Sequence, residues 1–155
     1  MKLTFTKGKG KFDRLDITTM AGPQPPIECP KQGIIPHDMV HFAVESEVTT
    51  LGFLGGIAAG GGQGFTAGDD NPHHRAVERL VETVQAEAWA GTASADDDFI
   101  ALYQVTCAAR GDVPLALDAA IIAAIRARLA ALTARWQAVA VGGSISLVLD
   151  VPTRG

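Results

Sequence analysis

The chain has 155 residues, of which 47% are hydrophobic and 19% are charged, and its formal net charge at pH 7 is −4. This length corresponds to one domain that can bury a core without disulfides, and the composition differs from that of disordered chains. The net negative charge and the absence of a long basic helix argue against an extended surface that binds nucleic acid. Without a secretory signal or about 20 uninterrupted apolar residues, we expect no contact with membranes and a cytoplasmic location.

The N-terminal segment predicts a β-hairpin. Leu3 and Phe5 alternate with polar residues, and after a glycine-bearing turn the range 12–19 alternates again. The prolines from Pro23 to Pro30 forbid a helix in this stretch and confine any strand around 27–29 to a sheet edge or a short piece. We therefore expect two paired strands followed by a stiff connector.

The middle of the chain predicts helices with recognisable start signals. The expected ranges are 36–48, 71–91, 94–111 and 114–139. Asn71 before Pro72 is a cap residue followed by proline at the first helical position, and Ser94 with Asp97 has the spacing of a capping box. Between the first two ranges, dense glycines predict a short buried helical piece and then a flexible loop at about 60–71.

The C-terminal range 144–151 predicts a last strand, with Ile145, Leu147 and Leu149 on one side. An isolated hairpin is only marginally stable in water, so this strand is expected to join the first two. The predicted fold is α+β: a small antiparallel sheet, made of the N-terminal hairpin and the C-terminal strand, packed against a layer of about four helices. We expect a single domain spanning 1–155.

The most informative motif is His37-Asp38-x-x-His41, at the start of the first predicted helix. Two histidines one helical turn apart can bind one metal ion. The pentapeptide resembles the zincin metalloprotease signature His-Glu-x-x-His, with aspartate in place of glutamate. The resemblance implies that His37 and His41 bind a divalent metal, zinc or similar, and that Asp38 acts as the catalytic general base on metal-bound water.

Further metal ligands are sought among the remaining polar residues. Glu45 lies eight residues after His37, about 12 Å along a helix, so it is predicted to orient His41 rather than to bind the metal. His73 and His74 are predicted to complete the metal site. All four histidines fall in the opening turns of two helices that begin with proline, where the helix dipole disfavours a charged ring. We therefore expect neutral rings that can coordinate.

Two functions from different classes follow from these residues. The first is a divalent-metal-binding domain that acts as a metal-dependent hydrolase of a small substrate. The alternative is a non-enzymatic binding or dimerisation module in which the histidines cap helices, with a small molecule, another protein or a second copy as its partner. Cys29 and Cys107 form no Cys-x-x-Cys pattern, and we interpret Cys29 as a buried thiol rather than a nucleophile.

Overall fold

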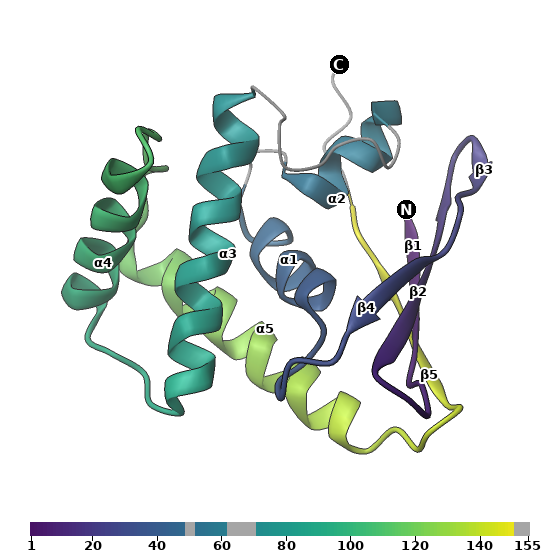
Figure 1. The fold of residues 1–155 in the computed structure, drawn as a ribbon. Helices are drawn as coiled ribbons and strands as arrows, with labels where there is room; N and C mark the ends of the chain where they lie inside the picture. The colour runs from purple at the N-terminus through teal and green to yellow at the C-terminus, as the bar shows by residue number, and fades with distance from the viewer. Residues whose placement is uncertain (49–51, 62–70, 151–155) are drawn as a thin grey trace.

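The computed structural model describes residues 1–48, 52–61 and 71–150 and has an α+β fold (Figure 1). An antiparallel sheet forms one layer, and the helices lie to one side of it. The predicted fold class is therefore confirmed. The glycine-rich loop predicted at about 60–71 falls mainly on residues 62–70, which are outside the described residues. No helix within the described ranges combines the length and apolar character that a bilayer-spanning segment requires.

The sheet is built around the N-terminal hairpin. Its strands are β1 (Lys2–Thr6), β2 (Phe12–Thr19), β3 (Gly22–Pro23), β4 (Ile27–Pro30) and β5 (Ser144–Val148). Their order is β3-β2-β1-β5, and β4 also pairs with β2. Leu3 of β1 lies opposite both Ile17 and Leu147, and all three side chains are buried. This register turns the apolar side of each strand toward the helices, as the alternating pattern predicts.

The helical layer follows the predicted ranges, with shorter ends. The helices are α1 (His37–Glu45), α2 (Phe53–Gly56), α3 (Pro72–Ala90), α4 (Asp96–Ala109) and α5 (Ala119–Gln137), with a π-helical turn η1 (Ile57–Gly61) after α2. Asn71 caps α3 through its side chain, and Gly91 ends it with φ of 75°. Both boundary predictions for α3 are confirmed, because proline at the start and a left-handed glycine at the end suit these positions.

Two predicted helix starts are wrong. The N-cap of α4 is Ala95, and Ser94 instead donates a hydrogen bond to Glu87 of α3, so no capping box forms. Helix α5 begins at Ala119 rather than at Pro114, because the side chain of Asp118 accepts the hydrogen bond that caps the helix. In both cases a local side-chain contact decides the boundary.

Helix α1 occupies the centre of the molecule. It packs against α2, α3, α5 and β4, and in Figure 1 it lies between α3 and the sheet. Four of its apolar side chains are fully buried: Met39, Val40, Ala43 and Val44. Polar side chains carried by this helix are therefore brought into contact with α3 and α2, the elements that contribute to the site described next.

Candidate metal centre

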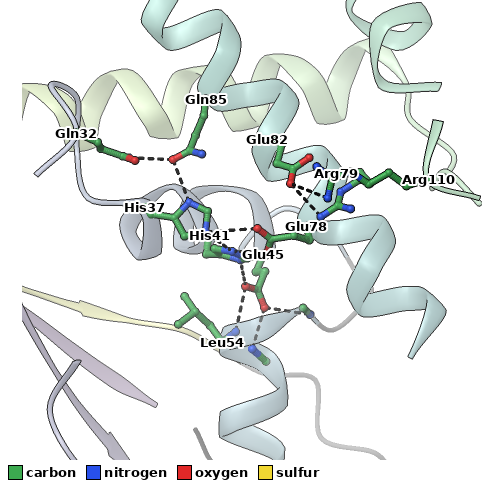
Figure 2. A network of polar contacts seen from close by, with 12 residues as sticks. Gln32, His37, His41, Glu45, Leu54, Glu78, Arg79, Glu82, Gln85 and Arg110 are labelled. Carbon is green, nitrogen blue, oxygen red and sulfur yellow. Dashed lines mark hydrogen bonds and ion pairs between the residues drawn. The ribbon is translucent and has the colours of Figure 1, made fainter. Parts of the chain in front are cut away.

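Three side chains from two helices converge at one point beside α1 (Figure 2). His37 and His41 lie one turn apart on α1, so their rings extend to the same side of the helix. Glu78 comes from α3, which packs against α1. His41 Nε2 lies 3.2 Å from His37 Nε2 and 2.9 Å from Glu78 Oε2, and His37 Nε2 lies 3.5 Å from Glu78 Oε1. These residues form a group that can hold a metal ion.

The packing of α3 explains why Glu78 reaches the histidines. The apolar side chains of α3 that are buried in the core are Val77, Leu80, Val81 and Val84. Glu78 lies at the edge of this apolar stripe, and its side chain is 33% exposed. Burial of the stripe against α1 therefore places the carboxylate at the boundary between core and solvent, within reach of the Nε2 atoms of both rings.

The spacing of the group is compatible with a single small ion. Zinc binds nitrogen and carboxylate oxygen at about 2.0–2.2 Å, so tetrahedral ligands lie about 3.3 Å from one another. The two ring nitrogens are 3.2 Å apart, close to that value. Glu78 approaches His41 through Oε2 at 2.9 Å and His37 through Oε1 at 3.5 Å, so its carboxylate would turn to present one oxygen to a shared ion.

A carboxylate holds the far nitrogen of the His41 ring. Glu45 Oε2 lies 3.0 Å from His41 Nδ1, so the contact predicted between these two residues is present. The Glu45 carboxylate also accepts hydrogen bonds from three backbone N–H groups, those of Gly52, Leu54 and Gly55 (Figure 2). An ionised carboxylate only accepts hydrogen bonds, so Nδ1 of His41 carries a hydrogen. In the neutral ring the lone pair is then on Nε2, which faces the other two ligand atoms.

A chain of amides fixes the second ring in the same way. Gln32 Nε2 donates to the backbone carbonyl of Ile35 and to Gln85 Oε1, both at 2.8 Å. Gln85 Oε1 lies 3.0 Å from His37 Nδ1. A backbone carbonyl can only accept, which orients the Gln32 amide and makes the facing atom of Gln85 an oxygen. His37 Nδ1 is therefore a donor. In the neutral ring the lone pair is then on Nε2, which faces His41 and Glu78.

The carboxylates dominate the electrostatics of the group. Burial alone would lower the pKa of His41, but hydrogen bonds to Glu45 and Glu78 outweigh it and raise that pKa from 6.5 to about 10. For His37, burial is likewise outweighed, chiefly by the hydrogen bond to Glu78, and the pKa is raised. Burial would raise the pKa of Glu78, but hydrogen bonds from the two rings hold it well below its ordinary value. The expectation that the helix dipole keeps the ring neutral is therefore wrong for His41 in the protein without metal.

The group is closed on the side of α2 and open on the other. The His41 and Glu45 side chains are each only 2% exposed, whereas that of His37 is 39% exposed. A ligand or water molecule can therefore approach past His37 and Glu78. The aromatic ring of Phe53 lies 5.8 Å from that of His41 and shields it from the α2 side.

Asp38, predicted to be the general base, is not part of the metal-binding group. Its side chain is almost fully buried, and its Oδ2 accepts a weak hydrogen bond from the Cys29 thiol at 3.7 Å. Burial raises the pKa of Asp38, and burial together with the Asp38 charge raises the pKa of Cys29 to about 12. The thiol is thus buried and protonated, in keeping with its interpretation as an inert residue. The catalytic role of Asp38 stays a prediction.

His73 and His74 are also outside the group. Both lie in the first turn of α3, where their backbone N–H groups donate to the Asn71 side chain at 2.9 and 3.4 Å. The helix that was expected to supply the third ligand contributes Glu78, rather than a histidine, to this group. This carboxylate lies one helical turn beyond His74.

Sequence reasoning did not single out Glu78 or Gln85: Glu78 was assigned to the surface side of α3, and Gln85 was not considered. Gln85 is in fact buried, and Glu78 lies next to the buried Val77 and Val81. A usable signal was present: the two residues are seven positions apart, so they share the face that carries the apolar stripe. Polar residues at such positions indicate either a satisfied core contact or a site.

Comparisons with known proteins leave this geometry as the basis for assigning a function. The chain matches no protein-family model, no curated protein and no solved structure.

Proposed function

We propose that this chain is a divalent-metal-binding domain that holds zinc or a similar ion through His37, His41 and Glu78. One observation carries the proposal. Two imidazole nitrogens and a carboxylate lie at separations of 2.9 to 3.5 Å, and each ring is held at its other nitrogen by a separate partner. Metal-binding histidines are typically held in this way by a carboxylate or carbonyl.

The charges of the group support a divalent ion in particular. Two neutral rings with lone pairs 3.2 Å apart repel each other unless a cation lies between them. A proton on His41 relieves this repulsion but leaves the carboxylates of Glu45 and Glu78 facing only one positive charge. A divalent ion balances both carboxylates, and it gives every lone pair in the group a partner.

The donor atoms also restrict the type of metal. The group offers nitrogen and oxygen but no thiolate, which suits zinc, iron, manganese or cobalt rather than copper in its reduced state. Calcium prefers about six to eight oxygen ligands at longer distances. Zinc is therefore the natural probe for a first experiment.

Metal analysis with ligand variants tests the proposal. Untagged protein purified without added metal is analysed for its elements, then stripped of metal and titrated with Zn²⁺. Near-stoichiometric binding is expected, with affinity reduced more than about 100-fold in His41→Ala and Glu78→Gln. His73→Ala is the matched control, because it removes an exposed histidine outside the group, and it should bind zinc like the wild type.

The result that contradicts the proposal is equally clear. Wild-type protein that binds neither zinc nor another of these metals leaves the histidines with a structural role only. Unchanged affinity in Glu78→Gln would place any bound metal elsewhere on the chain. Circular dichroism of each variant separates loss of the site from loss of the fold.

The open side of the group favours metal-assisted hydrolysis of a small substrate as a second function. Three protein ligands leave at least one coordination position for water, and the side chains of His37 and Glu78 are 39% and 33% exposed. A bound metal would lower the pKa of that water and generate a nucleophile. Turnover of simple ester and phosphate substrates by zinc-loaded protein tests this. Asp38→Asn should keep the metal but lose turnover if Asp38 is the base.

The alternative is a binding or dimerisation module in which the histidines are structural. In that case the partner is a small molecule, another protein or a second copy of the chain. Absence of metal at every stage of purification, combined with self-association in sedimentation experiments, would favour it. A cytoplasmic location is part of both proposals.

A further inference from the structure

Glu45 connects the proposed metal centre to the segment Gly52–Gly55. We infer that this segment positions the Glu45 carboxylate and thereby sets the affinity of His41 for metal. The inference rests on the proposed function, because it concerns how the same site is controlled. Its basis is a set of backbone contacts and one glycine at which no side chain fits.

The Glu45 carboxylate has no spare acceptor position. Its Oε1 accepts from Gly52 N at 3.0 Å and from Gly55 N at 2.8 Å. Its Oε2 accepts from Leu54 N at 3.1 Å and faces His41 Nδ1 at 3.0 Å. Two carboxylate oxygens offer about four lone-pair positions, so four donors occupy all of them. The side chain is therefore held in one orientation, and three of its four restraints come from this segment.

Gly52 makes this arrangement possible by leaving space. A Cβ atom at this position would lie 2.7 Å from Glu45 Cδ and 2.9 Å from Glu45 Oε1. It would also lie 2.5 Å from Val77 Cγ1 in the core. The backbone of Gly52 has φ of −109°, which any residue can adopt, so the requirement for glycine is one of space. Gly52 is thus a positioning residue that acts through Glu45.

The effect on metal binding follows from the role of the far nitrogen. A carboxylate that accepts from Nδ1 fixes the ring orientation and strengthens Nε2 as a ligand, and losing such a partner typically costs about 10- to 100-fold in metal affinity. Displacing Glu45 frees the His41 ring to turn its Nε2 away from Glu78. Because coupling between two sites is reciprocal, metal on His41 must in turn stabilise the segment that holds Glu45.

Zinc titrations of paired variants test the inference. Glu45→Gln keeps the shape but places an N–H₂ group where an oxygen accepts, and Gly52→Ala pushes the carboxylate aside. Each is expected to lower the affinity for Zn²⁺ about 10- to 100-fold. The double variant should bind no more weakly than Glu45→Gln alone, because both changes act through one carboxylate.

Matched controls exist for both substitutions. Glu47→Gln removes a nearby carboxylate that binds Arg128, and Gly10→Ala adds a methyl group where nothing lies within 4 Å. Both should keep wild-type affinity. A second measurement needs no variant: hydrogen exchange at the amides of Gly52, Leu54 and Gly55 should slow when zinc is added to the wild type.

Failure of this inference can be told apart from failure of the proposed function. If the wild type binds no metal, the proposed function is overturned and this inference with it. If the wild type binds zinc but Glu45→Gln and Gly52→Ala bind it equally well, only the inference is overturned. Additive losses in the double variant, or amide exchange that zinc does not change, would also overturn it.

Discussion

Helix α3 carries two polar clusters of opposite character. Glu78 faces the histidines of α1, whereas its neighbour Arg79 faces Asp112 after α4 and Glu82 on α3 itself. Figure 2 shows Glu78 and the Arg79 contacts on adjacent parts of α3. Both clusters contain buried as well as partly exposed side chains, and both combine carboxylates with nitrogen groups. They differ in where the positive charge comes from.

The cluster around Arg79 contains its own cations. The buried carboxylate of Asp112 accepts from Arg75 Nε at 2.8 Å, and its Oδ2 lies 3.6 Å from Arg79 Nη1. Arg79 Nη2 lies 2.9 Å from Glu82 Oε1. Guanidinium groups stay protonated at all ordinary pH values. This cluster therefore holds a fixed set of charges that ties α3 to the segment after α4.

The cluster around His41 has no permanent cation. Its rings can take a proton or a metal ion at the same nitrogen atoms, so the positive charge is exchangeable. Two carboxylates face these rings, and one of them is held by backbone N–H groups whether or not a cation is present. The comparison indicates that cation exchange belongs to the α1 side of α3 and structural support to the α4 side.

The largest effect expected from this difference is a pH-dependent stability that zinc removes. Because the folded pKa of His41 is raised from 6.5 to about 10, its stabilising contribution is complete below pH 6.5 and is lost as the pH rises toward 10. The loss in metal-free protein should be on the order of 4 kcal/mol. The lowered pKa of Glu78 has the opposite sign, so its contribution is lost in acid.

Urea unfolding in a pH series with chelator and with Zn²⁺ measures this effect. Zinc replaces the proton on Nε2, so the zinc-loaded protein should keep its stability over the alkaline range. The cluster around Arg79 contains no residue of the proposed metal site and should not produce a difference between chelator and Zn²⁺. A metal-free protein whose stability is flat from neutral pH to about pH 10 would remove the distinction between the two clusters.

The next largest effect is the loss of folding stability when the cluster around Arg79 is broken. Among the described residues, Asp112→Ala leaves the Arg79 guanidinium with Glu82 as its remaining ion-pair partner, and removal of one member of a buried ion pair costs about 3 kcal/mol or more. The affinity for zinc should not change. Asp97→Ala is the control, since that aspartate is exposed and should contribute only a few tenths of a kcal/mol through the helix dipole. Loss of zinc binding in Asp112→Ala would show that the clusters act as one.

The sequence predicted the fold better than it predicted helix boundaries. Alternation in the range 12–19 and the cap-proline pair Asn71-Pro72 carry local information, and both predictions are confirmed. The start of α5 was predicted at Pro114. The helix instead begins after Asp118, whose side chain accepts a hydrogen bond from a backbone N–H of the first turn. Both start signals are local, and helix boundaries are the least sharply defined part of such a pattern, so the sequence does not say which of the two the backbone uses.

Two of the three residues that could hold a metal ion, His37 and His41, could be found from the sequence. His37 and His41 share a helix, so their convergence follows from helical geometry alone. Glu78 comes from another helix, and its approach depends on how α1 and α3 pack, which no spacing rule encodes. The same holds for the residues that contact the other nitrogen of each ring. Glu45, the partner of His41, lies on the same helix and could be predicted, whereas Gln85, the partner of His37, is 48 residues away and could not.

A smaller loss of stability is expected at the edge of the cluster around Arg79. Tyr103 is fully buried, and its hydroxyl donates to the Ala76 carbonyl at 2.8 Å and accepts from Leu115 N at 3.1 Å. Tyr103→Phe removes both contacts while keeping the ring, so it should cost about 1–3 kcal/mol. Thermal unfolding measures the loss. Zinc affinity equal to that of the wild type would show again that support on the α4 side is separate from the site.

The smallest effect concerns Cys29, which contacts Asp38 of α1 but does not belong to the cluster around His41. Burial and the charge of Asp38 raise the pKa of this thiol to about 12, so very little thiolate exists at neutral pH. Iodoacetamide should alkylate Cys29 in the native protein more than about 100-fold more slowly than in the unfolded chain, with little effect of zinc. Mass spectrometry of digested samples separates it from Cys107, which is also buried. Rapid labelling of the native protein would indicate a reactive thiol beside Asp38 and would extend the chemistry of α1 beyond cation exchange.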